Sequence, residues 1–92
     1  MMNQGPDRVD TGAKPILYVK SGCPWCEEAE AHLKQAGIEY TRRDARANRS
    51  DMEAMVKVSG QSLAPTMIWG EDVLADFGVD ELIPFLASKN VG

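Results

Sequence analysis

The sequence is poor in metal-ligating side chains, with two cysteines and one histidine among 92 residues. A closed structural zinc site takes four nitrogen or sulfur ligands, so this chain alone is short of ligands for one. Apolar runs are short as well, and none approaches the roughly 20 residues that span a bilayer. The first ten residues, M-M-N-Q-G-P-D-R-V-D, contain no hydrophobic segment of the kind that a secretory signal needs. We therefore expect a cytoplasmic protein.

Positive charge is also in short supply. Ten Lys and Arg residues stand against 14 Asp and Glu residues, which gives a formal net charge of −4 and a pI near 4.8. Nonspecific nucleic-acid binding needs clustered basic residues, so the composition disfavours this function. The exception is a run of four arginines, which is either a solvated loop and helix start or an anion-attracting patch near the site. It comprises Arg42, Arg43, Arg46 and Arg49.

The chain length and the hydrophobic content of 43% predict one small domain with a modest core. Residues 1–13 have few apolar side chains, so we expect a disordered tail there and a folded domain at 14–92. Apolar periodicity and turn formers predict the order β-α-β-α-β-β-α, an α/β architecture with a four-stranded mixed sheet flanked by helices. The strands are expected near 15–20, 38–43, 65–69 and 73–75, and the helices near 23–36, 48–59 and 79–87.

Two local features refine this order. The run P-I-L-Y-V-K (15–20) does not alternate between apolar and polar residues, so it predicts a strand that is buried on both faces. Pro84 lies within the last helical pattern, and a proline in a helix interior removes a hydrogen bond and clashes with the preceding turn. Pro84 is therefore awkward in that helix unless it lies in the first turn.

Both cysteines occur in S-G-C-P-W-C (21–26), which leaves three interpretations. A structural disulfide is rare in the cytoplasm, and a bridge across two residues would constrain little of the unfolded chain. Zinc would need further ligands, and His32 falls on the polar side of the predicted helix, although a metal cluster shared by two chains stays open. Redox exchange is favoured, because a Cys-X-X-Cys pair between a strand and a helix is typical of it.

The predicted position of the pair suits thiol–disulfide chemistry. Cys23 would lie at a helix N-terminus, where free N–H groups and the helix dipole favour a thiolate, and Lys20 could add a positive charge. Cys26 would lie one turn later on the inner face, where it could attack a mixed disulfide formed at Cys23. Trp25 offers apolar surface to a substrate or packs at the helix start.

Three segments resemble the glutaredoxin family, within the thioredoxin superfamily. K-S-G-C-P-W-C (20–26) resembles that family's lysine, two further residues and C-P-Y-C. S-G-Q-S-L-A-P-T (59–66) resembles its S-G-x-x-T-V-P segment, and G-V-D-E-L (78–82) resembles the end of its G-G-x-D-D-L signature. The resemblance covers the chain from about Lys14 to Lys89. It implies a thioredoxin-like fold and a glutathione-dependent disulfide oxidoreductase of cell redox homeostasis and electron transport, with no tightly bound cofactor.

The resemblance also assigns roles to residues around the cysteines. Cys23 would be the nucleophile, and Cys26 the resolving cysteine of a redox-active disulfide. Pro65 would be a cis proline that faces the active site. The backbone of Ala64 would pair with bound substrate like a short antiparallel strand.

The same resemblance implies a glutathione site. Lys20 and Gln61 would hold the glycine carboxylate of glutathione. The backbone of Val79 and Asp80, near a helix start, would receive the γ-glutamyl carboxylate, and the Asp80 side chain would meet the ammonium group. Taken singly, Gln61 could be a turn residue and Asp80 a helix cap. The residues expected at the substrate are Lys20, Trp25, Gln61, Ala64, Pro65, Val79 and Asp80.

Departures from the family pattern leave the reductant open. Phe77 replaces the first glycine of the family's glycine pair and could crowd the γ-glutamyl pocket. The hairpin before Gly78 is longer than usual, and Ala64 replaces the common valine. The segment 69–80 also aligns without gaps to the glutaredoxin-like electron donors of ribonucleotide reductase, which are reduced by thioredoxin reductase.

Two alternatives therefore accompany a glutathione-dependent enzyme. One is a redoxin that thioredoxin reductase reduces and that donates electrons to ribonucleotide reductase. The other is a dimer that holds an iron–sulfur cluster through Cys23 of each chain and two glutathiones. Without a cluster we expect a monomer that acts on disulfide-containing proteins.

Overall fold

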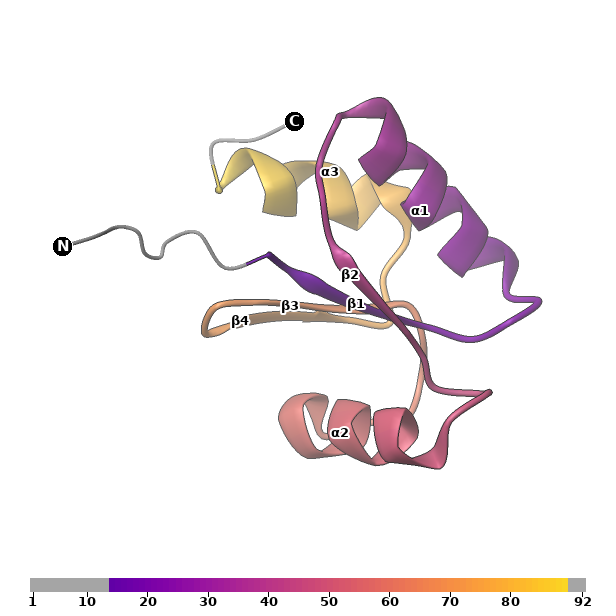
Figure 1. Ribbon diagram of the computed structural model, residues 1–92. Helices are drawn as coiled ribbons and strands as arrows, with labels where there is room; N and C mark the ends of the chain where they lie inside the picture. Colours follow the sequence, from indigo (N-terminus) through magenta and orange to yellow (C-terminus); the bar gives the residue numbers. More distant parts are fainter. Residues whose placement is uncertain (1–13, 90–92) are drawn as a thin grey trace, which may run out of the picture.

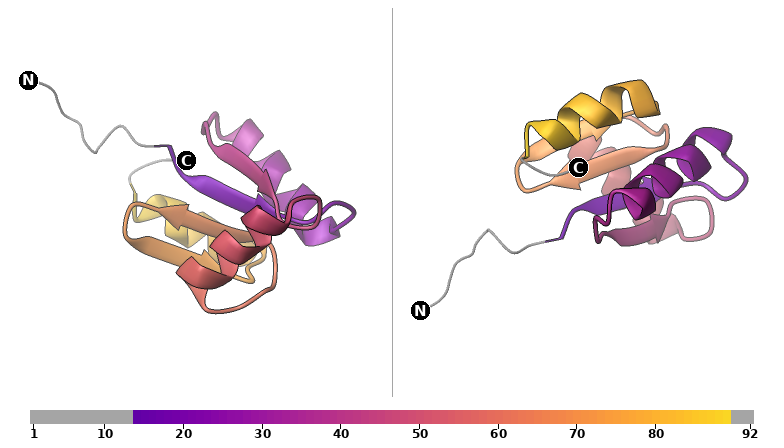
Figure 2. Two further views of the ribbon diagram at one scale, coloured as in Figure 1. Left: turned by 60° about the horizontal axis from the view of Figure 1, so that its bottom comes forward. Right: turned by 90° about the horizontal axis from the view of Figure 1, so that it is seen from above.

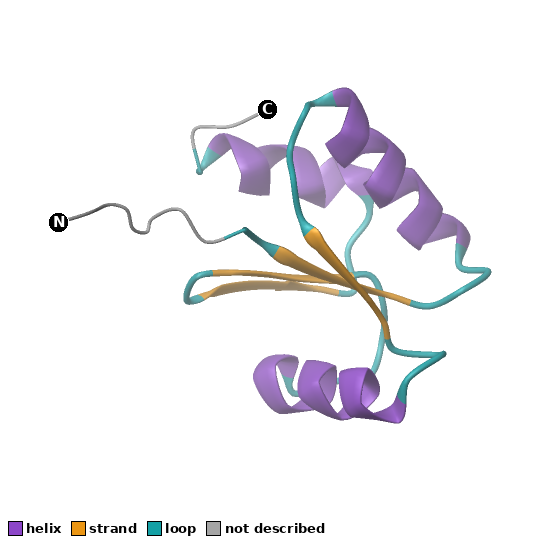
Figure 3. Ribbon diagram, viewed as in Figure 1, coloured by secondary structure: helices purple, strands orange, loops and turns teal. Residues whose placement is uncertain are grey.

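All seven predicted elements are present in the computed structural model, which describes residues 14–89. Their order is the predicted β-α-β-α-β-β-α (Figure 3). The elements are β1 (Ile16–Val19), α1 (Pro24–Gln35), β2 (Thr41–Asp44), α2 (Arg49–Ser59), β3 (Thr66–Trp69), β4 (Asp72–Ala75) and α3 (Val79–Ala87). The tail expected at 1–13, and residues 90–92, lie outside the described residues.

The four strands form one mixed sheet in the order β2-β1-β3-β4. β1 and β2 are parallel, whereas β3 is antiparallel to both β1 and β4. Helices α1 and α3 cover one face of the sheet and α2 covers the other (Figure 1). Two further views show α1 and α3 on the same side of the sheet, opposite α2 (Figure 2). This is the thioredoxin-like arrangement that the sequence predicts.

Strand β1 is buried on both faces, as its lack of alternation predicts. Leu17 and Val19 have no exposed surface and pack in the cluster that α1 and α3 share. Tyr18 points to the other face, where it packs with Met55 of α2. Because successive side chains of a strand point to opposite faces, three consecutive apolar residues supply both halves of the core.

The second strand starts three residues later than the predicted 38, because α1 ends in a tight capping motif. Gly37 has φ +73°. Its N–H donates to the Lys34 carbonyl at 3.1 Å, and the Ile38 N–H donates to the Leu33 carbonyl at 3.0 Å. These two bonds make a Schellman motif, in which a glycine in the left-handed region closes the helix. Ile38 therefore belongs to the end of α1 rather than to β2.

Pro84 lies beyond the first turn of the last helix, in the position that the sequence analysis identified as awkward. Helix α3 begins at Val79, so Pro84 is an interior residue. Its missing N–H removes only the bond to the Asp80 carbonyl, in the exposed first turn. Leu82 and Leu86 on the opposite side are fully or almost fully buried. Burial of that apolar side outweighs the local cost of the proline.

Candidate active site

Cys23 is the residue that begins helix α1. It has extended backbone angles (φ −88°, ψ 115°) and is the N-cap, and Pro24 occupies the first helical position, as predicted. The Cys26 N–H donates to Cys23 Sγ at 3.3 Å. The sulfur thus takes the place of the side-chain oxygen that usually caps a helix. A negative charge that forms on this sulfur meets an N–H donor and the positive end of the helix dipole.

Cys26 lies one turn behind Cys23 and is only 2% exposed. Burial, together with its side-chain hydrogen bond to Cys23, raises the pKa of the Cys26 thiol from 9.0 to about 12. Both cysteines are free thiols in this structure, and Cys23 is half-buried. At neutral pH, Cys26 therefore keeps its proton and is screened from large molecules, while Cys23 faces outward.

A tight turn connects β1 to Cys23. The Cys23 N–H donates to the Lys20 carbonyl at 3.1 Å, and Gly22 has φ +84°. This pattern is a type II turn, which needs a positive φ at its third residue. The Lys20 ammonium donates to the Ser62 carbonyl at 2.7 Å. Lys20 thus links the cysteine turn to the loop before β3.

The loop before β3 contains a cis peptide bond between Ala64 and Pro65, as the resemblance implies. The Pro65 carbonyl accepts from the Phe77 N–H at 3.4 Å. Within residues 14–89, the Ala64 amide and carbonyl have no hydrogen-bond partner. Ala64 is half-buried and packs against the same core cluster as Cys23.

The Gln61 side chain is turned into this same loop. Its Nε2 donates to Ser59 Oγ at 2.9 Å and to Thr66 Oγ1 at 3.0 Å. Its Oε1 accepts from the Leu63 N–H at 2.7 Å. Both amide hydrogens and one oxygen lone pair are therefore engaged within the protein. Gln61 is therefore placed to hold the loop in its conformation. This is the alternative role, as a turn residue, that the sequence allows.

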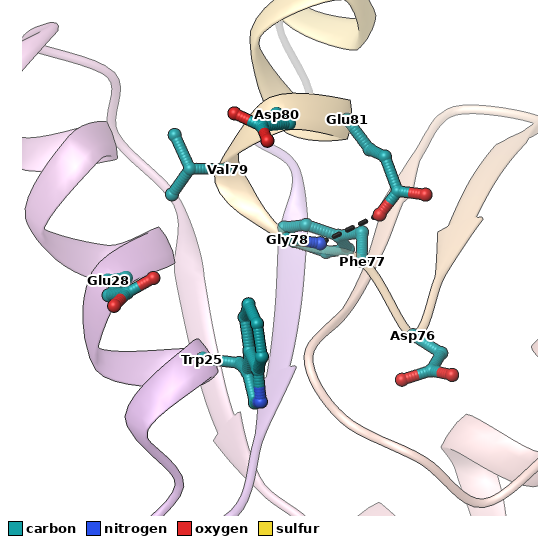
Figure 4. A pocket seen from close by; sticks show the side chains of 8 residues that line it. All are labelled: Trp25, Glu28, Asp76, Phe77, Gly78, Val79, Asp80 and Glu81. Atoms are coloured by element: carbon teal, nitrogen blue, oxygen red, sulfur yellow. Dashed lines mark hydrogen bonds between the residues drawn. The ribbon is translucent and has the colours of Figure 1, made fainter.

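A pocket of about 650 Å³ lies between the first turn of α1 and the start of α3 (Figure 4). Trp25 forms the α1 side with a side chain that is 61% exposed. A Cβ placed on Gly78 would come within 3.5 Å of the Trp25 ring. The residues that line the pocket are Trp25, Glu28, Asp76, Phe77, Gly78, Val79, Asp80 and Glu81.

The lining of this pocket carries four carboxyl groups and no basic side chain. The Gly78 N–H donates to Glu81 Oε1 at 2.8 Å, drawn dashed in Figure 4. This bond is the glutamate half of a capping box, and it occupies the N–H of Gly78, the N-cap residue of α3. The pocket therefore has a negative electrostatic character, which sequence reasoning missed except for Asp80.

Phe77 contributes to the pocket from below the surface. It is 2% exposed and packs in the core cluster with Cys26 and Leu82. Its ring thus fills the interior, and its backbone leads into Gly78 at the pocket wall. The bulk that replaces the family's glycine is accommodated by the core.

The structure sorts the predicted site residues into two groups. Lys20 is tied to the loop that carries Ala64 and Pro65. Trp25, Val79 and Asp80 line one pocket. Gln61 belongs to the loop that carries Ala64 and Pro65, but its amide is engaged within that loop. Sequence reasoning missed Ser21 and Asp44, whose side chains bond to each other across 23 positions of the chain.

Two further observations bear on what else the chain could bind. Among residues 14–89, no three His, Cys, Asp or Glu side chains are placed to hold a metal ion. Within the same range, every helix is too short or too polar to cross a membrane.

Comparisons of the sequence with a family model and with a curated protein both point to the same family. A family model described as Glutaredoxin matches residues 16–74. Glutaredoxin 3 of Escherichia coli K12 is 33% identical over 49 residues, which are 53% of this chain and 59% of that protein. The chain thus matches well under two thirds of the length of this curated relative.

Two solved structures extend the likeness to the fold. The thioredoxin-like protein BC3987 has a TM-score of 0.72 at 22% identity, over 79% of this chain and all of that one. A buckwheat glutaredoxin in complex with glutathione has a TM-score of 0.63 at 17% identity, over 82% and 69% of the two chains. At these identities the similarity is one of fold.

Proposed function

The chain belongs to the glutaredoxin family, and we propose on that premise that it is a thiol–disulfide oxidoreductase in which Cys23 is the nucleophile and Cys26 resolves. The observation that carries this proposal is the place of Cys23 as the N-cap of α1, with the Cys26 N–H on its sulfur. Thiolates at helix N-termini are the reactive form of cysteine in such sites. A buried second thiol one turn away completes a dithiol pair.

The reaction takes place in two exchanges. The Cys23 thiolate attacks one sulfur of a disulfide, the S–S bond breaks, and the other sulfur leaves as a thiolate that takes up a proton. The mixed disulfide on Cys23 is then attacked by a second thiolate. If Cys26 attacks after losing its proton, the product is a Cys23–Cys26 disulfide, and the substrate has gained two electrons. If Cys23 carries glutathione from a glutathione mixed disulfide and a second glutathione thiolate attacks the sulfur of that bound glutathione, the product is glutathione disulfide and the Cys23 thiolate is regenerated.

The high pKa of Cys26 fits the order of these steps. A thiol with a pKa of about 12 remains protonated while Cys23 makes the first attack. The main cause of that pKa is burial, and formation of the mixed disulfide removes the negative charge on Cys23 that also opposes ionisation of Cys26. Cys26 thus becomes a better nucleophile once the first exchange is complete.

Glutathione is the reductant in this proposal. Val79 and Asp80 at the start of α3 line a pocket beside Trp25, and Lys20 is the first residue of the turn that ends at Cys23. The solved buckwheat relative contains glutathione. The physiological targets are disulfides of proteins and mixed disulfides with glutathione, in the reducing cytoplasm, with the protein acting as a monomer.

Three observations favour a second source of electrons, thioredoxin reductase. The Gln61 amide is engaged within its own loop, the Gly78 N–H is occupied by Glu81, and the pocket lining has no basic side chain. Glutathione has two carboxylates and one ammonium group, so each of these features weakens its binding. A redoxin reduced by thioredoxin reductase keeps the same cysteine chemistry and needs no glutathione pocket.

The test is NADPH oxidation coupled to a small mixed disulfide of glutathione under two electron supplies. One reaction contains glutathione and glutathione reductase, and the other contains thioredoxin reductase alone. We expect turnover with glutathione, and turnover only with thioredoxin reductase would establish the second supply instead. Cys23→Ser is the control, because it should be inactive in both reactions; retained activity would overturn the proposal.

A further inference from the structure

Ser21, the second residue of the turn before Cys23, is held by the side chains of Asp44, the last residue of β2, and Arg46, in the loop that follows β2. The Ser21 hydroxyl donates to the Asp44 carboxylate. The Arg46 guanidinium donates to the Ser21 carbonyl at 2.8 Å. Neither Asp44 nor Arg46 takes part in the thiol–disulfide exchange described above.

The contacts of Ser21 with Asp44 and Arg46 depend on the pairing of the two parallel strands β1 and β2. Asp44 is the register partner of Val19 at the end of the β1–β2 pair, and the Ala45 N–H donates to the Val19 carbonyl at 2.8 Å. Because β1 and β2 are parallel, the loops that follow them leave the same edge of the sheet. Ser21, two positions after Val19 in the chain, therefore comes within reach of Asp44.

Asp44 is itself held in place by its own loop. Its Oδ1 accepts from the Arg46 N–H at 2.9 Å and from the Ala47 N–H at 3.1 Å. These bonds form an Asx-type turn, which fixes the carboxylate before Ser21 binds to it. The bond from Ser21, followed by those from the loop amides, lowers the pKa of Asp44. The carboxylate is therefore ionised at neutral pH, and its hydrogen bonds are charge-assisted.

The turn before Cys23 can adopt a second backbone conformation. Gly22 is its third residue, and glycine adopts positive and negative φ about equally well. The Ser21–Gly22 peptide could thus rotate between the type II orientation seen here, with Gly22 at φ +84°, and a type I orientation. The group that would swing in this rotation is the Ser21 carbonyl, which Arg46 holds.

We propose that Asp44 and Arg46 are positioning residues that lock the Ser21–Gly22 peptide and so keep Cys23 Sγ on the Cys26 N–H. A further bond, from the Lys20 ammonium to the Ser62 carbonyl, ties the first residue of the same turn to the loop before β3. Release of the peptide would let Cys23 leave the N-cap geometry that stabilises its thiolate. The proposal rests on the proposed function in taking Cys23 as the nucleophile.

The test is a double-mutant cycle of Ser21→Ala and Asp44→Ala. The measured quantity is the rate constant for alkylation of Cys23 by iodoacetamide across pH, with the modified peptide identified by mass spectrometry. This reaction needs neither glutathione nor a reductase. We expect each variant to lower the rate at neutral pH about threefold to tenfold, in line with the loss of one or two hydrogen bonds. The double variant should be no slower than Asp44→Ala, because both changes break the same contact.

The sign of the Asp44 effect separates positioning from simple electrostatics. Removal of a negative charge near Cys23 would by itself favour the thiolate and speed alkylation. A slower reaction of Asp44→Ala therefore indicates that the hydrogen bonds that fix the Ser21–Gly22 peptide have been lost. Thermal unfolding is measured in parallel, since a merely structural role would lower the midpoint and leave the alkylation profile of the folded protein unchanged.

Matched variants complete the experiment. Arg46→Ala should slow alkylation, whereas Arg49→Ala, which removes the same charge from the start of α2, should leave it unchanged. Ser50→Ala is the corresponding control for Ser21→Ala. If Asp44→Ala does not fold, the pair Arg46→Ala and Arg49→Ala carries the test alone.

Two results would count against these ideas in different ways. If wild-type Cys23 reacts quickly but Ser21→Ala and Arg46→Ala react equally fast, or if the cycle is strictly additive, the lock is refuted and the proposed function stands. If wild-type Cys23 reacts no faster than free glutathione at the same pH, the activated nucleophile is refuted, and the lock falls with it.

Discussion

The Cys26 amide lies 3.3 Å from the sulfur of Cys23, while the thiol of Cys26 itself is buried behind it. Cys26 thus has two separate relations to Cys23, one through its backbone amide and one through its side-chain thiol. In the proposed mechanism the backbone N–H faces the attacking sulfur of Cys23, and the side chain resolves the mixed disulfide. This relationship makes separable predictions for the two cysteines.

Replacement of Cys26 by serine should split the activities. Cys26→Ser keeps the backbone N–H on Cys23, so reduction of a glutathione mixed disulfide by excess glutathione should continue within about threefold of wild type, a change below 1 kcal/mol in the barrier. Reduction of a protein disulfide that needs the second thiol should fall at least tenfold. Both rates are followed by NADPH oxidation, and an unchanged rate with the protein disulfide would contradict the resolving role.

The raised pKa of Cys26 predicts a loss of stability in alkaline solution. Below pH 9 the thiol is protonated in the folded and unfolded states alike. Between pH 9 and about 12 the unfolded chain loses this proton and the folded protein keeps it, so the free energy of unfolding falls as pH rises. The slope for one proton is at most about 1.4 kcal/mol per pH unit.

The control for this effect is Cys26→Ser, which removes the titrating thiol. Urea unfolding of the reduced protein at several pH values should show a steeper decline for wild type than for this variant. Tyr40 titrates in an overlapping range, since burial and then its bond to Glu30 raise its pKa from 10.0 to about 12. It is common to both proteins, so the difference isolates Cys26; parallel declines would contradict the assignment.

The orientation of Gln61 predicts a role in the loop before β3. Gln61→Ala should lower the free energy of unfolding by about 1–3 kcal/mol, because it leaves groups inside the loop without partners. It should also slow reactions with glutathione and protein disulfides alike. Ser62→Ala is the control, because only the Ser62 backbone makes a described contact. A rise in the KM for glutathione with unchanged stability would instead indicate direct binding.

The negative pocket predicts a charge effect on the use of glutathione. Glu28→Gln removes one carboxylate from the lining and should lower the KM for glutathione about twofold to threefold at low salt, as expected for a partly screened surface charge. Glu27→Gln makes the same change on the same helix outside the lining, so it should have little effect. Equal effects of the two variants would show that only net charge matters.

The Schellman motif at Gly37 predicts a change in stability alone. Gly37→Ala should destabilise the protein by about 1 kcal/mol, because alanine is disfavoured at the φ of +73° found there. A Cβ at this position would meet no atom within 4 Å, so the cost is purely conformational. Thermal unfolding measures the loss, and turnover at a temperature where the protein is folded should be unchanged. A loss of activity there would show unexpected coupling to the site.

Much of the fold could be predicted from local patterns. The buried character of β1, the start of α1 at the cysteine pair and the end of α2 at Gly60 follow from apolar spacing and from capping residues. The start of β2 could not be placed as well, because Ile38 has the composition of a strand residue and its place in the capping motif depends on hydrogen bonds to α1. Pro84 is tolerated inside α3 because burial of Leu82 and Leu86 outweighs local propensity.

The site was harder to predict than the fold, because its details depend on contacts between distant segments. The Gln61 amide is satisfied by Thr66 and by its own loop, which no local pattern reveals. The contact between Ser21 and Asp44 depends on the register of two parallel strands. A polar residue at the end of each parallel strand was the available signal, since such ends meet at one edge of a sheet. The four carboxyl groups of the pocket likewise come from two helices and a loop.

The most direct test of the central claim is to trap the covalent intermediate on Cys23. Cys26→Ser is incubated with glutathione disulfide, and the modified peptide is mapped by mass spectrometry without a reductant. We predict that a glutathione mixed disulfide forms on Cys23. At neutral pH it should form faster than a free small-molecule thiol reacts with glutathione disulfide in solution. An unmodified Cys23 in folded protein would contradict the claim that this cysteine is the nucleophile.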